Sequence, residues 1–170
     1  MRPDRAYEGL MLARRKLFDW VKLLNQEQYT KHMPTGLHTL RATMVEMCRG
    51  EWIYSLRLRG ETPPPRDQWP ISEDKQPTFA DLERVWTDQA KRTHAQLAST
   101  SDWSRPVEYR VQQPGKIIHY STTAGDLVTQ LLFHEVHHRA QAMAMLRSLG
   151  VEAQNLDYSL HMFTRREESA

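Results

Sequence analysis

Apolar residues recur along the chain at intervals of three, four and seven, the spacing that gathers side chains on one face of an α-helix. This pattern predicts a first helix over residues 4–26. It predicts a second helix from Thr39, a suitable N-cap, to Leu58, because Gly60 then ends the pattern. The second helix is apolar around most of its circumference, so we expect it to pack between several neighbours.

Two more long helices are predicted in the second half of the chain. A variant capping box at residues 78–81 starts the third helix, which continues through Leu97. The fourth begins near residue 123 and ends at Gly150, and the residues of its predicted inward seam are four and three positions apart in turn. This seam consists of Leu127, Leu131, His134, His138, Gln141 and Met145. A short terminal helix is expected over about residues 157–166.

The connections between these helices indicate the fold class. Residues 60–77 contain five prolines, and a connection of this length suits a crossover at the end of a bundle better than a tight turn. Residues 107–111 alternate in polarity, and a Pro-Gly pair and an apolar run at 117–120 follow, which predicts a hairpin. We therefore predict an all-α fold in a single domain over residues 1–170. It is a four-helix bundle with a long Pro-rich crossover between helices 2 and 3 and a small β-hairpin before helix 4.

Composition limits the classes of partner. The net charge of +2 is too small to favour nucleic acid, and we interpret the basic run Arg14-Arg15-Lys16 as a solvated helix face. No apolar run approaches membrane length and no leader opens the chain, so we expect a cytoplasmic protein that binds no membrane. The single cysteine, Cys48, fits a reducing compartment and is expected to be a buried thiol, because it lies within an apolar helical pattern.

The run His134-Glu135-Val136-His137-His138 carries the strongest chemical signal. Formally it is H-E-x-x-H, the zinc-protease helix in which two histidines bind the metal and the glutamate is the base. On a helix, His134 and His138 lie on one face with their Cβ atoms about 5–6 Å apart, so both rings can reach one ion. The alternative is a hydrogen-bonded structural pair, but a shared ion also satisfies one nitrogen of each ring. His137 is rotated about 100° from His138 and is expected to lie beside the seam.

A zinc protease needs a third ligand, which this chain does not supply convincingly. Proteases with a third histidine require it at the position of Ala144, after a glycine at the position of Gln141. None of the glutamates after Gly150 is well placed to serve instead. A protease cleft also needs a strand edge for peptide, and this chain is mostly helical, so a protease with Glu135 as base is the least favoured hypothesis.

Other parts of the sequence resemble the DinB-like family of metalloenzymes. Residues 132–141 are similar to that family's last bundle helix, which carries H-x-x-x-H followed by R-G-Q, with Ala140 in place of the glycine. Residues 39–63 resemble its S-I-R-x-T-L-x-H…A-E-W-x-W…R…G-x-x-P segment, and residues 156–158 also match. The resemblance covers nearly the whole chain, and the three motifs occur in the family's order.

This resemblance implies a metal site with three protein ligands. The family places its first metal-binding histidine where Glu46 stands here, so the implied ligands are Glu46, His134 and His138. Two imidazoles and a carboxylate suit one divalent ion: zinc or nickel is expected first, and manganese or iron also fits. In the alternative, Glu46 is exposed and pairs with Arg49, and the metal is weakly bound or absent.

The resemblance also implies a site open to solvent in a homodimer and, in branches of the wider superfamily, the use of a low-molecular-weight thiol. Our first hypothesis is therefore a divalent-metal-dependent enzyme acting on a small molecule, such as a thiol-dependent S-transferase. The second is a non-catalytic, stress-associated dimeric bundle whose metal is structural or lost, which the glutamate at position 46 favours. The apolar circumference of the second helix, with Trp52 and Tyr54 on different sides, supports a dimer.

Overall fold

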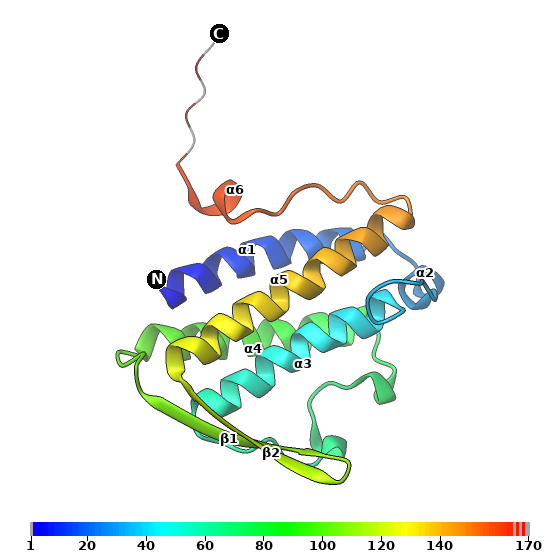
Figure 1. The fold of residues 1–170 in the computed structure, drawn as a ribbon. Helices are drawn as coiled ribbons and strands as arrows, with labels where there is room; N and C mark the ends of the chain where they lie inside the picture. The colour runs from blue at the N-terminus through cyan, green and yellow to red at the C-terminus, as the bar shows by residue number, and fades with distance from the viewer. Residues whose placement is uncertain (1, 165, 167, 169–170) are drawn as a thin grey trace.

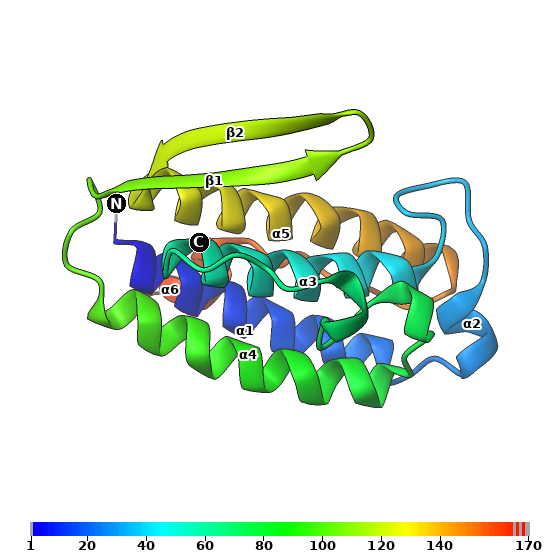
Figure 2. The same ribbon diagram turned by 90° about the horizontal axis from the view of Figure 1, so that it is seen from below.

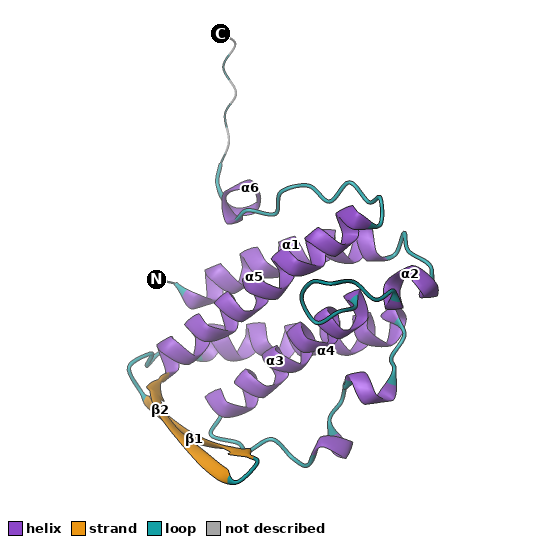
Figure 3. Cartoon of the chain, turned by 45° about the vertical axis from the view of Figure 1, so that its right-hand side comes forward, coloured by secondary structure: helices purple, strands orange, loops and turns teal. Residues whose placement is uncertain are grey.

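The computed structural model describes residues 2–164, 166 and 168, and this part of the chain is mostly helical with one antiparallel hairpin (Figures 1 and 3). The long helices are α1 (Pro3–Val21), α3 (Leu40–Leu58), α4 (Phe79–Ser99) and α5 (Ala124–Ser148). The short helices are α2 (Gln26–Thr30) and α6 (Tyr158–Met162), with 3₁₀ turns η1 (Arg66–Gln68) and η2 (Glu73–Lys75). The strands are β1 (Pro106–Gln113) and β2 (Lys116–Thr123), paired so that Tyr109 lies opposite Tyr120.

The four long helices lie side by side. α3 packs against α5 and α4, and α1 packs against the same two helices. Figure 2 shows α1 and α5 running in one direction and α3 and α4 in the other. The segment between Leu58 and Phe79 therefore returns along the molecule, because α4 begins at the end where α3 begins (Figures 1 and 2).

Threonine caps start three of the long helices. The hydroxyl oxygens of Thr39, Thr78 and Thr123 accept backbone N–H groups in the first turns of α3, α4 and α5. Each cap satisfies a donor that has no partner inside the helix, so these starts were predictable from the sequence.

Two predicted helix ends are wrong. The first predicted helix ends at Val21 and not at residue 26, because Asn25 forms a capping box with Gln28 and starts the separate helix α2. The predicted terminal helix is shorter as well: α6 ends at Met162, and residue 165 within the predicted range lies outside the described residues.

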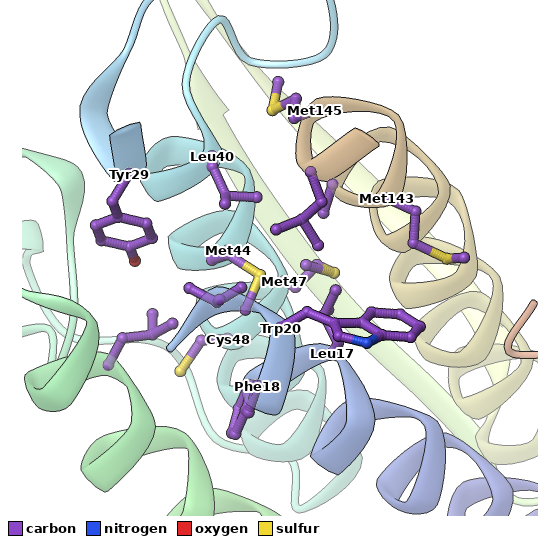
Figure 4. Packing of buried hydrophobic residues seen from close by; sticks show 14 of the residues in the cluster. Leu17, Phe18, Trp20, Tyr29, Leu40, Met44, Met47, Cys48, Met143 and Met145 are labelled. Atoms are coloured by element: carbon purple, nitrogen blue, oxygen red, sulfur yellow. The ribbon is translucent and has the colours of Figure 1, made fainter. Parts of the chain in front are cut away.

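Apolar side chains from the long helices form the core between them. Figure 4 shows part of one buried cluster, to which Leu17, Phe18 and Trp20 of α1, Met44 of α3 and Met143 and Met145 of α5 all belong. Cys48 is fully buried in this cluster, as predicted. Burial raises the pKa of its thiol well above the usual range, so it remains an unreactive, protonated group.

The proline-rich segment covers part of α3. The ring of Trp69 lies 6.1 Å from that of Trp52 and 5.3 Å from the guanidinium carbon of Arg49, and its Nε1 donates a hydrogen bond to the carbonyl oxygen of Pro64. Some of the apolar surface of α3 that favoured a dimer is therefore in contact with the chain's own proline-rich segment. Among the described residues, no helix has the length and apolarity needed to span a membrane.

Candidate metal centre

Helix α5 carries two parallel seams that are offset by one residue. The predicted seam contains Leu127, Leu131 and Met145, which are buried, but its members His134 and His138 are only half-buried. The second seam is buried throughout and consists of Val128, Leu132, Glu135, Arg139, Ala142 and Leu146. The second seam is thus the centre of the buried face of α5, one residue further along the chain than the predicted seam. The two histidines lie at the edge of this buried face, where a site can open to solvent.

The structure brings together the three residues implied by the sequence resemblance. Glu46 comes from α3, and His134 and His138 come from successive turns of α5. Each offers one ligand atom, and these atoms all lie within 4.8 Å of one another. The Oε1 atom of Glu46 is 3.5 Å from Nε2 of His134, and the group is half-buried. Such a group could hold a metal ion.

A hydrogen bond holds His138 in a form that could bind a metal. Its Nδ1 lies 2.8 Å from Oε1 of Gln141, whose amide nitrogen lies 3.0 Å from Nε2 of the exposed His137. A proton on Nδ1 of His138 satisfies Gln141 and leaves the lone pair of Nε2 free, as the hydrogen-bond partners of metal-binding histidines commonly do. Burial lowers the pKa of His138, which favours the neutral ring that a metal requires. His137 lies beside the pair, as expected.

Gly50 of α3 makes room for the ring of His134. A Cβ atom at Gly50 would lie 2.5 Å from Cε1 and 2.8 Å from Nδ1 of His134, closer than side-chain carbons approach in proteins. Gly50 follows Glu46 by one helical turn, so both face α5. The backbone of α3 therefore accepts the imidazole in this position only because residue 50 has no side chain.

Glu46 is shared between an arginine and the histidines. Arg49 donates a hydrogen bond to Oε2, which is the pairing considered as an alternative from the sequence, while Oε1 is directed towards His134. The side chain is half-buried and does not lie on the outer surface. Burial raises the pKa of Glu46, but hydrogen bonds with His134 and Arg49 outweigh this effect, so the pKa is below its usual value and the group is an anion. One anionic oxygen and two imidazole nitrogens suit a divalent ion such as zinc.

Glu135, the glutamate of the H-E-x-x-H pattern, faces the core. It is 3% exposed, and both of its carboxylate oxygens accept hydrogen bonds from Arg14. A protease base must reach a water molecule at the metal, and this carboxylate is directed instead to the buried side of α5. The geometry therefore gives Glu135 a structural role.

Arg14, the partner of Glu135, was interpreted wrongly from the sequence. Arg14 is not part of a solvated face, since it is 3% exposed, although Arg15 and Lys16 are exposed as expected. Arg14 also donates to Oε2 of Glu51 at 2.6 Å, and its guanidinium carbon lies 4.3 Å from the centroid of the Trp86 ring. The two carboxylates therefore share one buried cation, an arrangement that satisfies charges which would otherwise be costly to bury.

Arg14, Glu51 and Glu135 form a buried ion cluster that was not predicted from the sequence. Tyr7 and Trp86 donate hydrogen bonds to the two oxygens of Glu51 and complete its partners. One signal was available: Glu135 and Arg139 fall in register with the apolar residues of the second seam of α5.

Comparison with known proteins gives a match over nearly the whole chain. The model of the DinB family matches residues 4–169. The protein called Protein DinB from Bacillus subtilis (strain 168) is 23% identical over 171 residues, which is 98% of this chain and 96% of that protein. Both matches include the two helices that carry Glu46, His134 and His138.

Proposed function

The chain belongs to the DinB family, and on this basis we propose that it is a divalent-metal-dependent enzyme acting on a small molecule. The observation that supports this proposal most is the group formed by Glu46, His134 and His138, whose ligand atoms lie within 4.8 Å of one another. Three protein ligands leave further coordination positions for water or substrate, as catalytic sites require and closed structural sites do not. Zinc or nickel is the first expectation for this set, and manganese or iron also fits.

The proposal also covers the arrangement of the helices and the oligomeric state. We interpret α1, α3, α4 and α5 as a four-helix bundle in a single domain, with the proline-rich segment as its long crossover. We also propose that the protein is a cytoplasmic homodimer. An exposed stripe on α5, in which Phe133 is 67% and Val136 is 43% exposed, supports a dimer because large apolar side chains rarely lie together in water.

The contacts of each residue at the candidate site indicate what that residue could contribute to a reaction. A divalent cation held there would stabilise an anionic oxygen or a thiolate in preference to its protonated form. Gln141 keeps the proton of His138 on Nδ1, and Arg49 holds the Glu46 carboxylate in place and anionic. We propose transfer of a low-molecular-weight thiol as the reaction class, as the family resemblance implies.

A second function is favoured by one contact. Arg49 already neutralises the Glu46 carboxylate, so a cation must compete with this ion pair. In that case the protein is a non-catalytic, stress-associated bundle in which the metal is structural or lost.

Element-resolved metal analysis of protein purified without a histidine tag distinguishes these two functions. The enzyme proposal expects about one divalent ion per chain, lost in His134→Ala and in His138→Ala. His137→Ala is the matched control, because this histidine is adjacent on the same helix but exposed, and it should retain the ion. Metal-free wild-type protein that does not take up zinc, nickel, manganese or iron would favour the second function.

A further inference from the structure

A hollow of about 680 Å³ opens beside the candidate metal centre. We call it the inner hollow: it is lined by Glu46, Gly50, Tyr54 and Arg57 of α3, by Trp69 of the proline-rich segment, by Arg110 of the hairpin and by His134. A second hollow of about 410 Å³, the outer hollow, shares Arg57 and Arg110 with it. The two arginines therefore lie where the hollows meet. We call Glu46, His134 and His138 the metal group, and two of its members, Glu46 and His134, lie in the wall of the inner hollow.

One face of α3 connects the metal group to these arginines. Glu46, Gly50, Tyr54 and Arg57 follow one another at steps of four, four and three residues, which places them in a single stripe. The ring of Tyr54 lies 5.7 Å from that of His134, and the guanidinium carbon of Arg57 lies 5.7 Å from the Tyr54 ring. Because α3 rises 1.5 Å per residue, the backbone positions of Glu46 and Arg57 are about 16 Å apart. A ligand that reaches both ends must be several bonds long.

The two shared arginines have unused hydrogen-bonding capacity. Within the described part of the chain, neither Arg57 nor Arg110 forms an ion pair or a side-chain hydrogen bond, whereas Arg49 is paired with Glu46. The guanidinium carbon of Arg57 lies 4.0 Å from the centroid of the Tyr109 ring, so its plane is supported by an aromatic surface. The inner hollow thus has an excess of positive charge.

Two carboxylates lie in the outer hollow. Glu61 is bound by Arg59 at 2.7 Å, and Glu108 belongs to the outer hollow alone. Neither lines the inner hollow, where Glu46 is the one carboxylate among the described lining residues. The wall of the inner hollow is apolar in part, since Ile53, Val111 and Ile117 contribute to it.

We propose that the inner hollow binds a small organic anion whose carboxylate or phosphate group is held by Arg57 and Arg110. The carbon chain of this ligand passes Tyr54, and its other end reaches the metal group. Guanidinium groups suit both anions because their planar donors match two oxygens at once. The inference rests on the proposed function, and it assigns to that enzyme an acidic substrate class.

The test uses three probes with one carbon chain: 6-mercaptohexanoate, 6-mercaptohexyl phosphate and the neutral 6-mercaptohexan-1-ol. Visible absorption of the cobalt(II)-loaded protein reports the metal end. The Nε–Hε cross-peaks of Arg57 and Arg110 in nuclear magnetic resonance spectra report the anion end, with or without metal. We expect both anions to bind at least about tenfold more tightly than the alcohol and to shift both cross-peaks.

Variants show whether the two arginines cause this preference. Arg57→Gln/Arg110→Gln should bind all three probes with the affinity of the alcohol while keeping its cobalt. The matched control Arg84→Gln/Lys116→Gln removes the same charge from exposed positions outside both hollows and should keep the preference. Tighter binding of one anion alone supports the inference and identifies its chemical class.

Two other outcomes separate the inference from the proposed function. Equal affinity for the anions and the alcohol in cobalt-loaded protein, with unshifted arginine cross-peaks, overturns the inference and leaves the enzyme proposal intact. Protein that binds no cobalt but whose arginine cross-peaks shift with the anions overturns the enzyme proposal and leaves the anion site.

Discussion

Gly50 of α3 lies directly against the imidazole of His134 of α5, with no space for even a methyl group between them. A glycine in the middle of a helix destabilises it by roughly 0.5–1 kcal/mol relative to alanine. At this position the absent side chain leaves space for the ring of His134 beside Glu46. The glycine therefore contributes to the site by allowing this close approach.

Gly50→Ala should therefore weaken metal binding by about tenfold or more, because the new methyl group displaces a ligand ring whose position sets the coordination geometry. The dissociation constant for zinc, measured by competition with a chelator, provides the test. Gly9→Ala is the matched control: its new Cβ would lie 2.6 Å from the ring of Tyr158, far from the metal group, and metal affinity should not change. Unchanged affinity in Gly50→Ala would contradict the role assigned to Gly50 in positioning His134.

Arg49→Gln should strengthen metal binding by about threefold or more, since it removes a positive charge that competes with the cation for Glu46. The same competition assay measures this change, and Glu46→Gln should show the opposite effect. Weaker metal binding in Arg49→Gln would mean that Arg49 mainly orients the carboxylate.

Glu135→Gln should lower the free energy of unfolding by about 3–5 kcal/mol, because it leaves the buried Arg14 without one of its charged partners. Urea denaturation of the metal-free protein measures this loss. Glu152→Gln, at an exposed position, should change stability by less than about 0.5 kcal/mol. Folded Glu135→Gln should keep its metal. If the wild type hydrolysed casein and Glu135→Gln did not, Glu135 would instead be identified as a catalytic base.

The buried thiol of Cys48 should make stability fall as pH rises above about 9. In the unfolded chain the thiol loses its proton near that pH, but burial raises the pKa in the folded protein, so the folded state binds more protons. The free energy of unfolding should then decrease by up to about 1.4 kcal/mol per pH unit. Denaturation at intervals between pH 9 and 10 should give a flatter slope for Cys48→Ala. Equal slopes would contradict this assignment.

Self-association should involve the outer stripe of α5. Light scattering at micromolar concentration should give about 40 kDa, twice the chain mass of 20.0 kDa. Phe133→Glu should give the monomer mass, because a charge would replace the most exposed apolar side chain of that stripe. A wild-type monomer would contradict self-association and would indicate that the contact of Trp69 with α3 covers enough of the apolar surface of that helix.

The helices and the hairpin were predictable because their signals are local. Threonine caps, a Pro-Gly turn and regular apolar spacing act within a few residues. The error at residues 22–26 has the same origin: Leu23 continues the apolar pattern although it is 71% exposed. The pattern shows which residues are apolar, but it does not show that the capping box of Asn25 has already started another helix.

The site was only partly predictable. The spacing of His134 and His138 indicated shared chemistry, and Glu46 followed from the family resemblance. The buried ion cluster was missed because its members lie on three helices, with Arg14 and Glu135 lying 121 positions apart in the sequence, and charged residues are normally assigned to the surface. Gly50 was missed as a part of the site because its effect depends on how closely α3 and α5 approach.

The one-residue offset between the seams of α5 has a mechanical consequence. Glu135 follows His134 directly, so rotating α5 to move the histidines would also pull the glutamate away from Arg14. A shift by one residue corresponds to about 100° of rotation and would expose a buried anion. The salt bridge in the core therefore restricts rotation of the helix that carries the two histidines of the candidate metal centre. A cation bound there would meet ligands that are already in place, so little conformational entropy would be lost on binding.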